Sequence, residues 1–194
     1  MNIEDFGPFT LSASAHSGPD QGMCVMEMVS FLAGEEWSDN PPCSSPIISR
    51  FCQVINDRMG QEFRDRLQTY VPRLIGTASP EHDADRAEYL VWSSIRVFAP
   101  IAMRAAGLEE WAVRLEGLSG SLAEARVVCR GARSAAAAAA AYDAAAAADA
   151  AAYAADDDAI FKVLDGLLKI GPSGATYTPA QIARVPELKR AVSA

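Results

Sequence analysis

One segment, Met23–Ala33, is apolar along almost its whole length and carries a single charge, at Glu27. Gly34 follows the segment and is a candidate to end a helix, because glycine readily adopts the left-handed conformation found at helix ends. A helix that is apolar on all sides lies in the middle of a domain. We therefore expect Met23–Ala33 to be a central helix that other helices surround.

Residues that start and stop helices divide the sequence that follows. Ser45 and Pro46 suit the N-cap and the first position of a helix, which Gly60 should end. Residues 62–75 repeat apolar side chains at helical spacing, and Pro72 should bend or break that helix. These signals predict amphipathic helices on both sides of Gly60.

A long helix should begin at Pro80, bend at Pro100 and stop at Gly107. Arg86 is expected away from the buried side of this helix. The buried side is predicted to carry apolar residues at helical spacing: Ala87, Val91, Ile95, Phe98, Ala102 and Ala105. A shorter helix is expected over Glu109–Glu116.

The tract Ser134–Ala159 is nearly all alanine, which has the highest helix propensity of all residues. Joined to the amphipathic residues 160–170, it predicts one long helix over residues 134–171. At about 100° per residue, the larger polar side chains gather on one side of that helix. These are Tyr142, Asp149, Tyr153 and Asp156.

The opposite side of the alanine-rich helix is almost bare alanine, which permits a close approach of another helix. Three interpretations stay open. The helix packs on its own domain, or it protrudes and binds a partner or a second copy of the chain, or the tract is a neutral expansion. In the second case Tyr142, Asp149 and Tyr153 are candidate binding residues.

The sequence predicts an all-α protein, a compact bundle of roughly six to eight helices. Phe9–Ala13 alternates weakly and allows one short strand, which cannot form a sheet alone. The expected parts are an irregular N-terminal arm (1–21), a helical core domain (22–133), the long Ala-rich helix (134–171), and a short C-terminal helix and tail (172–194).

The formal charge is −8 and the isoelectric point is near 4.8. An acidic surface repels phosphate, so direct nucleic-acid binding is not expected. The N-terminal residues lack the basic and apolar regions of a secretory signal, and no stretch is suited to span a membrane. We expect a cytoplasmic protein whose four cysteines are reduced.

The most informative local pattern surrounds Glu27. Cys24 lies one turn before it, and Asp39 and Cys43 return from the loop that follows. Burial could make Glu27 a general acid or base, with Cys24 as a second candidate catalytic residue. Asp39 and Cys43 are candidate binding residues beside them, and two thiolates with carboxylates could hold a metal.

A structural role for Glu27 is the other possibility. The carboxylate would then pair with an arginine or accept backbone N–H groups from residues 35–45, and Cys24 would be a small core residue. The spacing matches no established zinc motif, so no metal or cofactor is assigned. His16 and His82 stand alone in the sequence and are expected to be solvated.

No nucleophile elbow, phosphate-binding loop or dinucleotide fingerprint is present. We therefore expect a non-catalytic binding or assembly module, acting through a protein partner or through self-association by the Ala-rich helix. The alternative is an enzyme or a metal-binding protein that uses Cys24, Glu27, Asp39 and Cys43.

Several short motifs resemble one widespread group of bacterial and phage proteins. They are Gly22-Met-Cys24-Val-Met-Glu27, Leu32-Ala-Gly34-Glu35, Ser38-Asp39, Pro42-Cys43 and Pro46, with Asn56-Asp57 and Pro72-Arg73-Leu-Ile-Gly76-Thr77. Members are similar in their Ala-rich tails, and no activity is assigned to the group. The resemblance therefore implies no catalytic residue. It implies a phage or mobile-element regulator or inhibitor that acts on a basic surface of a host complex, in the host cytoplasm if phage-encoded.

Overall fold

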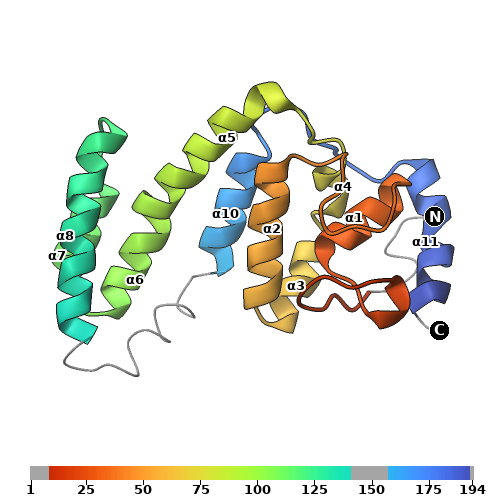
Figure 1. Ribbon diagram of the computed structural model, residues 1–194, viewed down its shortest axis with the longest axis horizontal. Coiled ribbons are helices and arrows are strands. Elements are labelled where there is room, and N and C mark those ends of the chain that lie inside the picture. Colours follow the sequence, from red (N-terminus) through yellow and green to blue (C-terminus); the bar gives the residue numbers. More distant parts are fainter. Residues whose placement is uncertain (1–8, 141–156, 193–194) are drawn as a thin grey trace. The chain divides into compact units, whose positions relative to one another are not determined.

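The computed structural model describes residues 9–140 and 157–192, and every regular element in them is helical (Figure 1). This confirms the all-α class. Phe9–Ala13 forms no strand within the described chain. None of the described helices combines the length and the apolar character that a bilayer crossing needs.

Two helices, α8 (Leu122–Ala140) and α10 (Asp157–Leu167), cover parts of the long helix predicted over residues 134–171. The residues between them lie outside the described chain, and they include the candidate binding residues Tyr142, Asp149 and Tyr153. A continuous Ala-rich helix therefore stays a prediction.

The chain divides into two compact units. Unit 1 contains residues 1–86 and 167–194, and unit 2 contains residues 87–166. The division falls inside the 22–133 segment that the sequence predicted as one core domain. It lies within α5 (Pro80–Ser93), whose pattern gives no break at that point.

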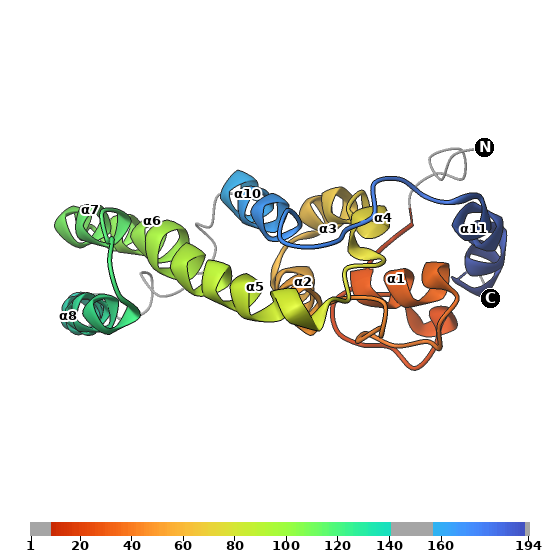
Figure 2. The ribbon, with the colours of Figure 1, turned by 90° about the horizontal axis from the view of Figure 1, so that it is seen from above.

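Helix α1 (Val25–Ala33) is the centre of unit 1, as its composition predicted. It contacts α2 (Pro46–Arg58), α3 (Gln61–Gln68), α4 (Val71–Leu74) and α11 (Pro179–Val192). Figure 2 shows α1 beside α11, and the short helix η2 (Pro19–Gln21) also contacts α11. Buried side chains occur on all sides of α1 (Val25–Ala33), and Glu27 is one of them.

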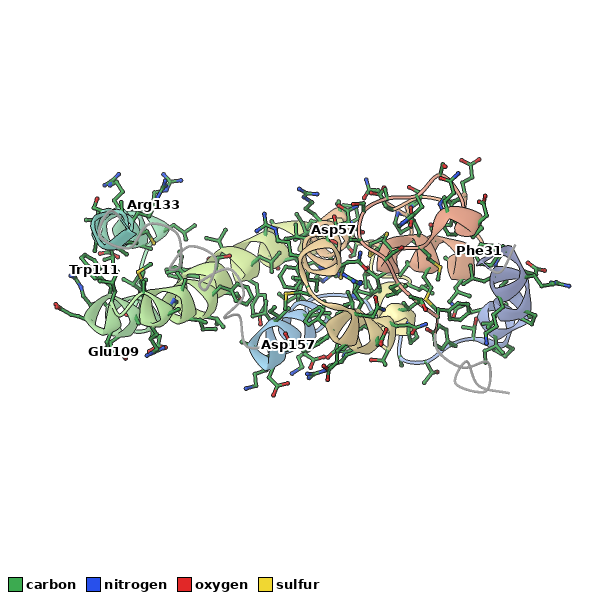
Figure 3. The ribbon with its side chains drawn as sticks, turned by 90° about the horizontal axis from the view of Figure 1, so that it is seen from below. Phe31, Asp57, Glu109, Trp111, Arg133 and Asp157 are labelled. Atoms are coloured by element: carbon green, nitrogen blue, oxygen red, sulfur yellow. The ribbon has the colours of Figure 1, made fainter. Side chains whose placement is uncertain are left out.

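The C-terminal end of α1 is closed by backbone and side-chain contacts. Gly34 has the left-handed φ of 82°, as expected for a helix-ending glycine. Arg184 of α11 donates a hydrogen bond from Nε to the Phe31 carbonyl at 2.6 Å. The same guanidinium lies 4.7 Å from the centre of the Phe31 ring, at the residue labelled in Figure 3. A cation at this position also suits the negative end of the helix dipole.

The starts of α2 and α4 follow the proline signals. Pro46 occupies the first turn of α2, and Pro72 occupies the first turn of α4, after the break that the sequence predicted. Ser45 stands at the N-cap of α2 without capping it through its side chain. Its hydroxyl instead donates to Asp83 at 2.6 Å, which ties α2 to the first turns of α5.

Arg86 is fully buried, although the helical pattern placed it on an exposed side. Its Nε donates to the Ile170 carbonyl at 2.9 Å, and its Nη1 donates to the Thr77 carbonyl at 2.8 Å. Asp83 lies 3.3 Å from Nη1 and supplies a counter-charge. The guanidinium therefore fixes the C-terminal segment after α10 to the turn before α5, and hydrogen bonds rather than apolar contacts justify its burial.

In unit 2 a π-helical turn, η3 (Ser94–Phe98), lies between α5 and α6 (Ala99–Ala105), just before Pro100, where the sequence predicted a bend. Proline has no N–H to donate to the preceding turn, and a wide turn is one way to accommodate that loss. Val91 is 43% exposed, so its predicted place on the buried side is wrong. Ala105 is exposed as well.

The remaining helices of unit 2 begin with α7 (Glu109–Glu116), whose bounds match the prediction. Arg104 of α6 pairs with Glu109 and Glu116 of α7, and α6 contacts α7 along the hairpin. Trp111 then packs against Gly131 of α8, where an added Cβ would lie 2.5 Å from the ring (Figure 3).

We predict that Arg86→Met lowers the free energy of unfolding by about 3 kcal/mol, because it leaves buried carbonyl groups without donors. Urea unfolding followed by circular dichroism measures the change. Arg58→Met is the matched control on an exposed position of α2, with an expected change within about 0.5 kcal/mol. Equal effects of the two substitutions would contradict the role given to Arg86.

Candidate functional site

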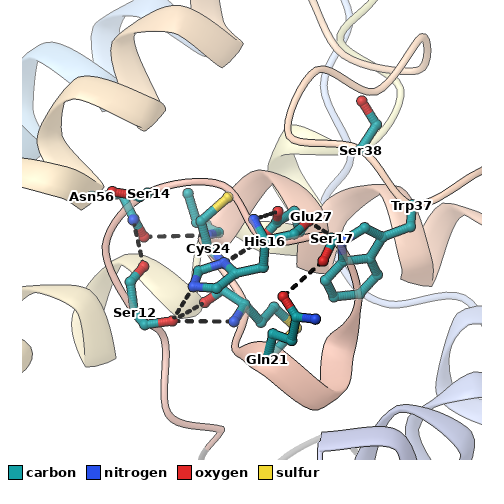
Figure 4. Close-up of polar contacts among 12 residues, drawn as sticks. Ser12, Ser14, His16, Ser17, Gln21, Cys24, Glu27, Trp37, Ser38 and Asn56 are labelled. Carbon is teal, nitrogen blue, oxygen red and sulfur yellow. Dashed lines mark hydrogen bonds and ion pairs between the residues drawn. The ribbon is translucent and has the colours of Figure 1, made fainter.

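Glu27 is 1% exposed, and N–H groups surround its carboxylate (Figure 4). The backbone N–H of Cys24 donates to Oε2 at 2.7 Å, which completes a capping box at the start of α1. The backbone N–H of His16 donates to Oε1, and Nδ1 of the His16 ring lies 2.9 Å from Oε2. The buried charge is therefore matched by three donors and by the positive end of α1.

His16 continues this network toward the surface. Its Nε2 lies 3.0 Å from the hydroxyl oxygen of Ser12. The His16 side chain is 13% exposed, so the expectation of a solvated histidine is wrong. Trp37 donates from its indole nitrogen to the His16 carbonyl at 2.8 Å and holds the backbone of the residue. Ser12, His16 and Glu27 thus form a continuous line of hydrogen-bonded side chains.

The segment that supplies Ser12 and His16 is fixed to α2. Asn56 of α2 donates to the Ser12 carbonyl at 2.8 Å and accepts the Val25 N–H at 3.2 Å. Asp57 accepts the N–H of Ser14, whose φ of 72° is unusual for a residue other than glycine. Several bonds to one rigid helix can hold such a strained backbone.

Gly22 lets the backbone approach the Ser12–His16 pair. Its φ is 124°, and an added Cβ would lie 2.7 Å from both the Ser12 hydroxyl oxygen and the His16 Nε2. Only glycine fits this position without displacing the pair.

The structure separates the four residues that the sequence grouped. Cys24 and Glu27 are in contact, but Cys43 has Glu35 as its neighbouring carboxylate, and Asp39 accepts a hydrogen bond from Gln53 through its backbone carbonyl. No three histidine, cysteine, aspartate or glutamate side chains of the described chain form a group that could hold a metal. The described residues therefore give no support to a metal site at Cys24, Glu27, Asp39 and Cys43.

Burial also makes the thiols poor nucleophiles. It raises the pKa of Cys24 to about 12, and the nearby Glu27 charge adds to the effect. Burial and the Glu35 side chain raise the pKa of Cys43 to about 11. Cys52 is fully buried beside Cys24, and its pKa is raised too. Because the thiolate is the reactive form, Cys24 behaves as a core residue rather than as a catalytic one.

A second candidate site is a cationic side of α8, which we call the α8 arginine face. It consists of Arg126, Arg130 and Arg133, at helical spacings of four and three residues, together with the adjacent Val127. All four side chains are exposed, and Val127 is 61% exposed. None of the three arginines has an ion-pair partner within the described chain.

Within the described chain, neutral residues line the hollow beside the α8 arginine face. Arg130 and Arg133 line a shallow surface hollow together with Ser134 and Ala137. Glu124, the one acidic residue of α8, bonds to the backbone and hydroxyl of Ser121 at the helix start. In Figure 3 Arg133 lies on the side of α8 away from Trp111.

Glu27→Gln should lower the free energy of unfolding by about 2–3 kcal/mol, because buried N–H donors lose a charged acceptor and the new amide brings its own donors. Urea unfolding measures the effect. The exposed Glu36→Gln is the control, with a change within about 0.5 kcal/mol. An unchanged stability of Glu27→Gln would show that the network does not hold unit 1 together.

We expect Gly22→Ala to lower the free energy of unfolding by about 1–3 kcal/mol through the strained backbone conformation alone. The added methyl group must also displace Ser12 or His16. Thermal unfolding compared with Gly60→Ala tests this, since a Cβ at Gly60 meets no atom within 4 Å. Melting temperatures lowered equally in both variants would argue against the close approach at Gly22.

No protein-family model, curated protein or solved structure matches this chain. The resemblance to the bacterial and phage group stays a prediction. The function is therefore inferred from the residues and geometry of this chain alone.

Proposed function

We propose that the protein is a helical binding module and that its partner-binding surface is the α8 arginine face. The observation that carries the proposal is a row of three exposed arginines on one side of a helix, none of them paired with an acid of the described residues, in a chain of net charge −8.

Repulsion among the three arginines destabilises α8. Like charges three or four residues apart destabilise a helix by about 0.2–0.5 kcal/mol per pair. Arg126 and Arg130 form one such pair, and Arg130 and Arg133 form another. An anionic partner removes this repulsion, because each guanidinium can bind a carboxylate with two hydrogen bonds.

Exposed apolar side chains favour a protein partner. The large hydrophobic residues that are exposed in the described chain are Val91, Val113, Leu122 and Val127. All of them belong to unit 2, and two belong to α8. A partner that buries Val127 and pairs with Arg126 and Arg130 would combine an apolar contact with a charged rim, as protein interfaces commonly do.

The partner that fits is therefore an acidic segment of another protein with apolar residues on one side. The basic partner surface that the resemblance implied stays a prediction, whereas the local charge of the α8 arginine face fits an acidic partner. A nucleic acid is the other kind of anionic partner that arginines can bind, and the exposed Val127 beside them favours a protein instead.

Binding of a fluorescein-labelled amphipathic peptide with glutamate on its polar side and leucine on its apolar side tests the proposal by fluorescence anisotropy. We expect binding that weakens as salt rises. The triple variant Arg126→Ala/Arg130→Ala/Arg133→Ala should raise Kd about tenfold, because each exposed ion pair contributes about 0.2–1 kcal/mol.

The matched control is Arg50→Ala/Arg58→Ala/Arg190→Ala, which removes the same charge from exposed positions in unit 1. It should leave Kd nearly unchanged. Equal losses in the two triple variants, or tighter binding of a single-stranded oligonucleotide than of the acidic peptide, would overturn the proposal.

A further inference from the structure

We propose that Ser12, His16 and Glu27 form an acyl-transfer triad that hydrolyses esters of small acyl groups. In this assignment Ser12 is the nucleophile, His16 is the general base and Glu27 is a positioning residue. The inference is independent of the α8 arginine face.

The distances between Ser12, His16 and Glu27 suit a nucleophile, a base and an acid that orients the base. Ser12 Oγ lies 3.0 Å from His16 Nε2, and His16 Nδ1 lies 2.9 Å from Glu27 Oε2 (Figure 4). Both fall in the range of about 2.6–3.2 Å that proton transfer and orientation need. Such triads are recognised by geometry, since they occur on unrelated folds and in different sequence orders.

The hydrogen bonds fix which ring nitrogen carries the proton. A carboxylate oxygen only accepts, so Nδ1 of His16 donates to Glu27. In the neutral ring Nε2 is then the acceptor, and the Ser12 hydroxyl donates to it. This is the tautomer in which histidine can take a proton from serine.

The nucleophile is also held in place from other directions. The Ser12 N–H donates to the Met23 carbonyl at 2.8 Å, and Asn56 donates to the Ser12 carbonyl at 2.8 Å. The Met23 N–H donates to Ser12 Oγ at 3.2 Å. The hydroxyl therefore accepts one bond, and of the two acceptors its own proton can reach, His16 Nε2 at 3.0 Å is closer than the Met23 carbonyl at 3.5 Å, so little rearrangement is needed before reaction.

Burial increases along the line from the nucleophile to the acid. Ser12 is partly exposed and has exposed neighbours at Ala13 and Ser14, whereas Glu27 is almost completely buried. The Gly22 backbone lies close to both Ser12 Oγ and His16 Nε2, so it restricts approach from that side. These features favour a small acyl group that approaches from the open side of Ser12.

The reaction balances with water as the second substrate. Ser12 Oγ forms a bond to the ester carbonyl carbon, and its proton passes to His16 Nε2. The bond to the alcohol oxygen then breaks, and that oxygen leaves with the proton from Nε2. Water attacks the acyl-serine through the same base, which releases the carboxylic acid and returns the proton to Ser12.

A fluorophosphonate probe tests the assignment on the full-length chain, because it forms a covalent bond with an activated serine. We expect one adduct by intact mass, located at Ser12 by peptide mapping. The adduct should be absent from Ser12→Ala and reduced at least about 100-fold in rate in His16→Gln, because a general base contributes about 10²–10⁴-fold.

Ser17→Ala is the matched control from the same exposed segment and should label like the unmodified protein. Hydrolysis of p-nitrophenyl acetate should follow the same order among the variants, and circular dichroism verifies that each is folded. A folded, unmodified protein without an adduct at Ser12, or with equal adducts at Ser12 and Ser17, would overturn the triad. In that case the hydrogen bonds among Ser12, His16 and Glu27 would serve only to hold the N-terminal segment in place.

Discussion

The burial of one carboxylate, Glu27, determines how unit 1 is organised. A charge inside an apolar helix is tolerated only when hydrogen-bond donors reach it. One donor comes from the start of α1 itself, and two come from His16, which lies before α1 in the chain. The segment that contains His16 must therefore lie on α1. Its other bonds, to Asn56 and Trp37, fix α2 and the loop after α1 around the same point.

The sequence predicts the helices of this protein well where a local signal specifies them. The apolar run of α1, Gly34 at its end, Pro46 at the start of α2 and the break at Pro72 all act within one or two turns. The amphipathic pattern of α7 is equally local. The need of Glu27 for partners could also be predicted, because a lone charge in an apolar helix requires them.

The identity of those partners could not be predicted, because it depends on contacts between distant segments. His16 looked solvated since nothing near it in sequence required burial, and its neighbour Glu27 is brought in by the fold. Arg86 is buried by carbonyls of the turn before α5 and of residue 170, which no helical period encodes. Val91 fits an apolar stripe by spacing, yet it is exposed, and the π-turn that follows it interrupts the regular helical period on which that stripe was drawn.

The bonds that hold the N-terminal segment are also the ones that would activate Ser12, so stability and reactivity in this site are linked. A histidine fixed by a buried carboxylate on one side and by a hydroxyl on the other loses little freedom when it accepts a proton. Gly22 contributes to both properties. Its backbone packs closely against Ser12 and His16, and the same close contact limits access to these two side chains. Substitutions that loosen the segment will therefore disturb both properties. Chemical labelling of Ser12 in the folded protein separates them, since packing alone gives a serine no unusual reactivity.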